Sequence, residues 1–113
     1  MSITRVVVRR RVADLDAAVP FYEGLTGAVS TRFAFSGAQL AAVGPFLLFA
    51  APDDIADRLE RVVATITVDD VAEWTRRLQS LGAEIVAPAT ATPNGQRLVA
   101  RHPDGSVFEY VSE

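Results

Sequence analysis

Apolar and polar residues alternate in short runs along this chain, and two stretches of helical spacing interrupt them. The β-branched residues at 4–12 predict a first strand. Asp14 is a good helix N-cap, and it precedes apolar residues that share one helical face, namely Leu15, Ala18, Val19, Tyr22 and Leu25. We expect Pro20 to kink this helix or to make its first turn irregular, and Gly27 to end it.

Three short strands and a polar segment follow. The strands are predicted at residues 28–35, 38–43 and 45–50, because the pairs Ser36-Gly37 and Gly44-Pro45 separate them. Residues 52–60 are polar and acidic, which predicts a linker with about one helical turn.

The same order of elements then returns. Residues 61–68 predict a strand, and Asp69 or Asp70 is expected to cap a second helix that Gly82 ends. The inward face of this helix holds Val71, Trp74, Thr75, Leu78 and Leu81. Three further strands are predicted at 83–87, 96–101 and 106–112.

The second half of the chain therefore repeats the first. Val12-Ala13-Asp14-Leu15 aligns with Val68-Asp69-Asp70-Val71 at an offset of 56 residues, about half of the 113 residues. We predict an α+β fold of two tandem βαβββ units, with unit one at 1–51, a linker at 52–60 and unit two at 61–113. The two units are expected to form one curved mixed sheet with the helices on its outer face.

Composition narrows the function classes. The length fits one domain, and 50% hydrophobic with 22% charged residues fits a soluble globular protein. The net charge of −3 disfavours nucleic acid as a partner. No apolar stretch is long enough to span a bilayer and no signal peptide is apparent, so we expect no membrane partner and a cytoplasmic location. The absence of cysteine and the single histidine, His102, exclude a thiolate or multi-histidine metal site in one chain.

The last strand carries an acid among apolar residues. Pro103-Asp104-Gly105 predicts a turn, after which alternation puts Glu109 on the same face as Val107 and Val111. A carboxylate in a buried strand is costly unless another group pairs with it.

Arginines of the first strand are the predicted partners of Glu109. Val7, Arg9 and Arg11 share one face of that strand, and the repeat matches the two arginines with Thr65 and Thr67, so all of these residues are expected on the inner face. Two interpretations of Glu109 stay open: a structural ion pair in a vestigial site, or a polar anchor or general base for a ligand. For Arg9 and Arg11, a solvated strand end or a subunit edge is the alternative to ligand binding.

Some aromatic residues are candidates for an apolar pocket. Phe33 and Phe35 alternate on one face of the second strand and are the better candidates. Trp74 is expected to serve packing or an interface, and His102 is expected to be a surface residue rather than a base.

These motifs together resemble the vicinal oxygen chelate superfamily, which includes glyoxalase I, extradiol dioxygenases, methylmalonyl-CoA epimerase and the bleomycin-resistance proteins. The residues that carry the resemblance span nearly the whole chain: Val12, Asp14, Leu15, Phe21, Tyr22, Gly27, Val68, Asp70, Leu78, Gly82, Pro103, Asp104, Gly105 and Glu109. The resemblance implies the glyoxalase/bleomycin resistance fold that the repeat also predicts.

The resemblance also implies where a metal would bind. Metal-dependent members use four ligands, from the first and fourth strands of each unit, and these positions fall here on Val7, Leu48, Val63 and Glu109. Three of these side chains have no donor atom for a divalent cation. We therefore expect no metal and no other cofactor.

The favoured hypothesis is a metal-free protein that sequesters an apolar or aromatic small molecule in a concave pocket, as the bleomycin-resistance branch does in antibiotic resistance. The expected ligand-binding residues are Arg9, Arg11, Phe33, Phe35, Leu48, Thr65, Thr67 and Glu109. The resemblance further implies a homodimer. The alternative is a lyase or isomerase of the glyoxalase-like class, for which Glu109 is the only candidate catalytic residue, and a third hypothesis is a purely structural role.

Overall fold

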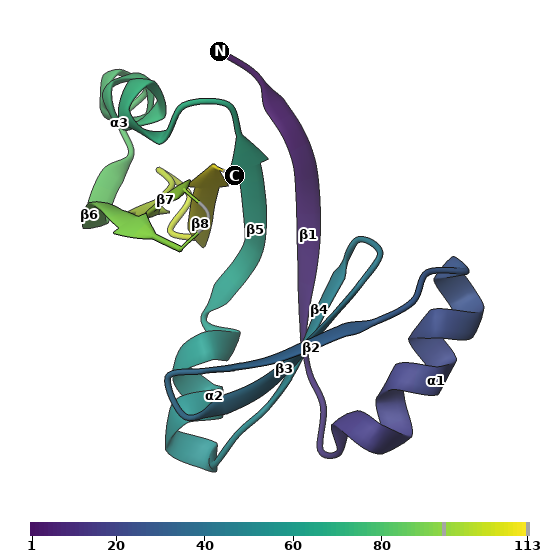
Figure 1. The fold of residues 1–113 in the computed structure, drawn as a ribbon. Helices are drawn as coiled ribbons and strands as arrows, with labels where there is room; N and C mark the ends of the chain where they lie inside the picture. The colour runs from purple at the N-terminus through teal and green to yellow at the C-terminus, as the bar shows by residue number, and fades with distance from the viewer. Residues whose placement is uncertain (94, 113) are drawn as a thin grey trace. The chain divides into compact units, whose positions relative to one another are not determined.

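The computed structural model describes residues 1–93 and 95–112 of the chain. Eight strands and three helices follow one another along these residues (Figure 1). In chain order they are β1 (Ile3–Arg11), α1 (Leu15–Thr26), β2 (Thr31–Phe35), β3 (Ala38–Val43), β4 (Phe46–Ala50), α2 (Asp53–Glu60), β5 (Val62–Val68), α3 (Val71–Ser80), β6 (Glu84–Thr92), β7 (Gly95–Arg101) and β8 (Val107–Ser112).

The chain divides into two compact units, which we name the α1 unit and the α3 unit after a helix that each contains. The α1 unit comprises Val8–Arg61, and the α3 unit comprises Met1–Val7 and Val62–Glu113. Strand β1 contributes its first half to the α3 unit and its second half to the α1 unit.

In the α1 unit the strands are ordered β2-β3-β4-β1. The pairs β2–β3 and β3–β4 are antiparallel, whereas β1 and β4 are parallel, with Arg9 opposite Leu47. Helix α1 covers one face through a core that includes Leu15, Val19, Ala41, Val43 and Leu48. Helix α2 covers the opposite face through Ala56, which packs with Ala38, Leu40 and Phe49. Figure 1 shows the two helices on opposite sides of these strands.

Helix α1 begins and ends where the sequence predicts. The Asp14 side chain accepts a hydrogen bond from the N–H of Asp16 at 2.9 Å, which caps the first turn. Gly27 adopts a left-handed conformation with φ of 75° and donates its N–H to the carbonyl of Glu23, which closes the last turn. Pro20 lies inside the helix, where it has no N–H to donate to the preceding turn.

In the α3 unit the strands are ordered β1-β5-β8-β7-β6. Strands β5 and β8 are parallel, and β8–β7 and β7–β6 are antiparallel. Of the two acids predicted as alternative caps, Asp70 caps α3, since its carboxylate accepts the N–H groups of Ala72 and Glu73. Helix α3 packs on one face of this sheet through a core of Ile66, Val68, Val71, Trp74, Leu78, Leu98, Ala100 and Tyr110.

The predicted α+β fold of βαβββ units with a mixed sheet is confirmed. The main difference is the segment expected to be a linker with about one turn, which contains the eight-residue helix α2. Acids in its first turn and Arg58 in its last favour the helix dipole, and Ile55, Ala56 and Leu59 give it an apolar face. Strand β6 also extends to Thr92, beyond the predicted end at residue 87. In the part of the chain that the structure describes, no helix has the length and apolarity needed to cross a membrane.

Candidate functional site

Glu109 lies on the face of the α3 unit that is opposite α3, and we call this face of β5, β8 and β7 the helix-free face. Residues on one strand alternate between faces, so Tyr110 packs under α3 while Glu109 points the other way. The side chain of Glu109 is 13% exposed. It accepts a hydrogen bond from the hydroxyl of Thr65 at 2.8 Å and forms an ion pair with the Nε–H of Arg97. The carboxylate is thus bound from both neighbouring strands.

Arg97 is a site residue that the sequence reasoning missed, because only arginines of the first strand were considered. The signal was present in the turn that joins β7 and β8. The turn fixes the register at Arg101 opposite Val107, which brings Val99 opposite Glu109. Arg97 therefore lies diagonally across from Glu109 on the same face, within reach of a long side chain.

The two threonines of β5 are buried on the helix-free face. Thr65 and Thr67 are 7% and 6% exposed. Thr65 lies opposite Glu109 on the neighbouring strand and donates to it. The Oγ1 atom of Thr67 is buried and has no hydrogen-bond partner among the described residues. A buried hydroxyl in this state calls for a partner such as a water or a ligand atom.

Arg9 and Arg11 belong to the α1 unit and contact helix α2. Arg9 donates to the carbonyl of Leu59 at 3.2 Å. Arg11 forms ion pairs with α2 carboxylates, at 2.9 Å to Asp53 and 2.7 Å to Asp57. The hydrogen bond to Asp57 above all raises the pKa of Arg11 above its ordinary value. These contacts give both arginines a role in holding α2, and their pairing with Glu109 stays a prediction.

The predicted orientation of Leu48 is wrong. Its side chain is fully buried in the core under α1, so it cannot contact a ligand on the opposite face. The equivalent of Glu109 is the preceding residue, because Leu47 lies opposite Arg9 in the same way that Glu109 lies opposite Thr65. The repeat alignment was one residue out of phase in the fourth strand.

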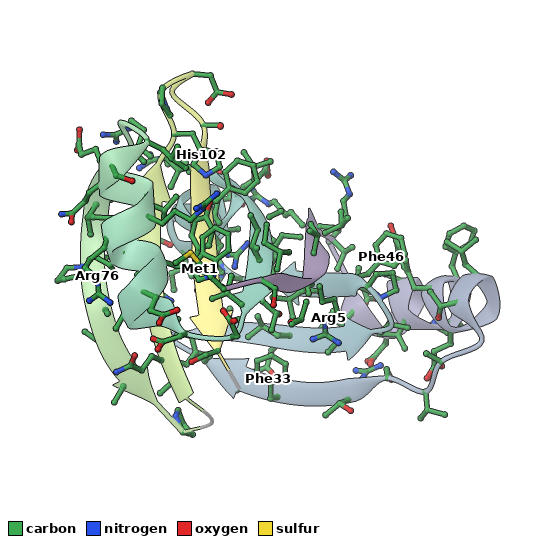
Figure 2. All side chains as sticks on the ribbon, turned by 90° about the horizontal axis from the view of Figure 1, so that it is seen from above. Met1, Arg5, Phe33, Phe46, Arg76 and His102 are labelled. Carbon is green, nitrogen blue, oxygen red and sulfur yellow. The ribbon has the colours of Figure 1, made fainter. Side chains whose placement is uncertain are left out.

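Phe33 and Phe35 lie on β2, where Figure 2 labels Phe33. Their side chains are 44% and 60% exposed, and they lie opposite Leu40 and Ala38, whose side chains pack on the α2 side of the sheet. Exposed aromatic rings are available for contact, and the part of these two residues in ligand binding stays a prediction.

The residues at the four positions where the resemblance implies metal ligands do not fit a divalent cation. With the corrected phase these positions are Val7, Leu47, Val63 and Glu109, so three of them offer no donor atom. The fourth is bound by the guanidinium of Arg97, which would repel a cation. Within residues 1–93 and 95–112 no group of three or more His, Cys, Asp or Glu side chains is placed to hold a metal ion.

His102 is not the plain surface residue that the sequence suggested. It lies at the base of the turn between β7 and β8 (Figure 2), is half-buried, and stacks on Phe108 with ring centroids 4.3 Å apart. Its Nε2 atom lies 2.6 Å from the hydroxyl of Tyr110. Trp74 packs in the core as predicted, stacked on Tyr110 at 6.1 Å, and its Nε1–H donates to Asp69.

Comparison with known proteins agrees with this geometry. The model of the Glyoxalase/Bleomycin resistance protein/Dioxygenase superfamily matches residues 3–110, so the chain belongs to this superfamily. No functionally curated protein matches the chain.

Several solved structures are similar to this chain. An uncharacterized protein from Methanosarcina mazei is 35% identical, with 100% of this chain and 94% of that chain covered and a TM-score of 0.92. The methylmalonyl-CoA epimerase from Mycobacterium tuberculosis is 26% identical, with 97% and 88% covered and a TM-score of 0.70. The methylmalonyl-CoA epimerase from Streptomyces coelicolor shares the fold at 19% identity, with 99% and 96% covered and a TM-score of 0.71.

Proposed function

We propose that this member of the superfamily is a metal-free protein that binds an apolar or aromatic small molecule, in the manner of the bleomycin-resistance branch. The observation that carries the proposal is the ion pair between Glu109 and Arg97. Glu109 is the one acidic residue among the four metal positions, and its carboxylate is already paired with the guanidinium of Arg97. The ion pair also gives the helix-free face a fixed pair of hydrogen-bonding groups, which is the usual way in which an apolar site orients its ligand.

The apolar part of the site is supplied by valines of the same face. Val63 is 53% exposed, and Val107 and Val111 are half-buried. A ligand that covers Val63 would remove apolar surface from water, and one of its polar atoms would give the buried hydroxyl of Thr67 a partner. We therefore assign Thr65, Thr67, Arg97 and Glu109 as the polar residues of the site.

Ligand binding is tested by thermal unfolding in the presence of bleomycin and a panel of neutral aromatic compounds. A ligand should raise the Tm of the wild type, and Glu109→Gln and Arg97→Met should each weaken its binding about tenfold, as expected for loss of one charged hydrogen bond. Arg101→Met is the matched control, since Arg101 lies on the same strand but pairs with the exposed Glu84. Equal affinity in all variants, or no stabilising compound, would contradict the proposal.

The second candidate is an isomerase, favoured by the 26% identity to an epimerase. In that reaction Glu109 would remove a proton from one face of a carbon next to a carbonyl group, and a proton delivered from solvent to the opposite face would complete the inversion. Arg97, already in contact with Glu109, would stabilise the negative charge that develops on the carbonyl oxygen. Solvent deuterium exchange at the corresponding carbon of methylmalonyl-CoA, lost in Glu109→Gln, would establish catalysis. Absence of exchange at high protein concentration would exclude this substrate.

The metal-free state is tested separately. The purified protein should contain no stoichiometric metal by elemental analysis, and Ni²⁺, Zn²⁺ or Mn²⁺ should give no EDTA-reversible increase in Tm. A stabilising ion would instead support the enzymatic candidate.

We further propose that the protein is a cytoplasmic homodimer. Phe21 and Leu25 support a subunit contact, since they lie one turn apart on α1 and are 66% and 61% exposed. Light scattering should then give about twice the chain mass of 12.1 kDa, and Phe21→Glu should shift the protein toward a monomer. A wild-type monomer at micromolar concentration would refute the dimer.

A further inference from the structure

A cavity lies on the other side of the α3 unit's sheet, where the end of α3 meets the turn between β7 and β8. Its volume is about 400 Å³, which is within the range of small-molecule sites. The residues that matter for its chemistry are Trp74, Leu78, Leu81, His102, Asp104 and Tyr110. Because Tyr110 and Glu109 point to opposite faces of β8, this cavity is separate from the site proposed above.

Two chain reversals form the mouth of the cavity. Helix α3 is followed by Gly82 with φ of 92°, a conformation that favours glycine, and this leaves Leu81 62% exposed at the rim. On the other side, the N–H of Gly105 donates to the carbonyl of His102 at 2.9 Å and closes the turn. The two reversals are neighbours. A Cβ atom added at Gly82 would lie only 3.8 Å from the ring of Pro103.

The walls are aromatic and aliphatic. Trp74 and Tyr110 stack with ring planes 23° apart, and Leu78 belongs to the same core cluster. These side chains are almost fully buried, so the core already holds them in place. A planar apolar group that enters from the Leu81 side would meet a preformed surface.

The negatively charged group at the mouth is the carboxylate of Asp104, and His102 lies beside it. Asp104 accepts hydrogen bonds from the N–H and hydroxyl of Ser106, at 2.9 and 2.5 Å, and the hydroxyl bond above all lowers its pKa. The carboxylate is exposed and ionised at neutral pH. Among the described residues no arginine lines the cavity, and the guanidinium of Arg77 lies over the Trp74 ring at 5.9 Å from its centroid. His102 uses Nε2 toward Tyr110, while its Nδ1 makes no hydrogen bond in the part of the chain that the structure describes.

We propose that this cavity binds a small aromatic amine, with its ring against Trp74 and Leu81 and its ammonium group beside Asp104. The apolar walls favour the ring, and the carboxylate favours a cation over an anion of the same shape. Aromatic rings near the ammonium add a cation–π contribution. The proposal does not depend on the function assigned to the helix-free face.

Trp74 makes the test direct, because it is the only tryptophan of the chain and lies in the cavity wall. The wild type is titrated with 2-phenylethylamine, with its neutral analogue 2-phenylethanol and with the anion 3-phenylpropionate, while Trp74 fluorescence is recorded. The amine should give a saturable change and bind about tenfold more tightly than the anion. Amide NMR shifts should be confined to residues 81–83, 102–106 and the Trp74 side chain.

Variants separate the two parts of the interaction. Leu81→Gln should weaken all three probes, whereas Val29→Gln, which replaces an aliphatic side chain that is 86% exposed and does not line the cavity, should have no effect. Asp104→Asn should weaken the amine about threefold to fivefold and leave 2-phenylethanol unchanged, as expected for an exposed charge.

The proposal would be overturned by no saturable response to the amine, by equal binding of the amine and the anion, or by undiminished binding in Leu81→Gln. Leu81 is mostly exposed, so its substitution should leave the fold intact and keep the test decisive. Weaker amine binding in Glu109→Gln would also contradict the proposal, because it would put the probe on the opposite face.

Discussion

The coupling between Arg97 and Glu109 can be measured with a double-mutant cycle. The variants are Glu109→Gln, Arg97→Met and the double variant, and each is unfolded with urea. Glutamine keeps an acceptor oxygen for Thr65, so the cycle isolates the interaction with the guanidinium. The free energy of unfolding should fall in both single variants and fall by less than the sum in the double variant.

The magnitude follows from the burial of the two partners. A hydrogen bond to a charged group contributes about 1.5–3 kcal/mol. The side chain of Glu109 is 13% exposed but that of Arg97 is 36% exposed, so solvent screening reduces the expected coupling to about 1–2 kcal/mol. For a chain of 113 residues, 1 kcal/mol corresponds to a Tm change of about 4 °C.

A second ion pair in the same sheet provides the control. Arg101 and Glu84 lie 2.9 Å apart, but their side chains are 44% and 68% exposed. The same cycle on this pair should give about 0–0.5 kcal/mol. If the coupling of Arg97 with Glu109 were no larger than this, the carboxylate would not be fixed in the sheet, and the argument that Arg97 excludes a metal from it would fail.

Three further predictions test the placement of individual residues. Leu48→Ala should lower the free energy of unfolding by about 2–5 kcal/mol in urea titrations, because it leaves a cavity under α1, and a cost below 1 kcal/mol would contradict its burial. Asp14→Ala and Asp70→Ala should each cost about 1 kcal/mol through loss of a helix cap, and helix-cap serines at these positions should restore stability. The N–H of Ser2 and other donors lower the pKa of Asp69 below its ordinary value of 3.8, so its contribution to stability is present above that pH and lost as the pH falls further. Asp69→Asn should therefore flatten the acid limb of the stability curve, and an unchanged limb would refute this.

Local signals explain why the fold was predictable from sequence. The two caps, Asp14 and Asp70, act through their own backbone neighbours, and Gly27 and Gly82 end helices through a conformation that glycine favours. These signals do not depend on tertiary contacts. Their recurrence half a chain apart, at an offset of 56 residues for the two caps, then indicated the duplication.

The errors came from features that only tertiary structure decides. The phase of Leu48 was wrong because strand alternation has a period of two, so an alignment error of one residue reverses the face. Arg97 is a different case: it was missed because only arginines of the first strand were considered, although the turn between β7 and β8 fixes the register that brings it near Glu109. The length of helix α2 was underestimated because so short a helix is stabilised by tertiary packing, here of Ile55, Ala56 and Leu59 on a sheet.

The two repeats have come to use corresponding faces differently. In the α1 unit, the face that bears Arg9 and Arg11 is covered by α2, and its arginines hold that helix. In the α3 unit, the corresponding face bears Thr65, Thr67 and Glu109. Helix α3 packs on the other face of these strands. A face already covered by a helix has little apolar surface left for a ligand, whereas a face with an exposed valine and an unpartnered buried hydroxyl has both of the features that a ligand satisfies. This asymmetry is the reason to look for the ligand in the α3 unit first.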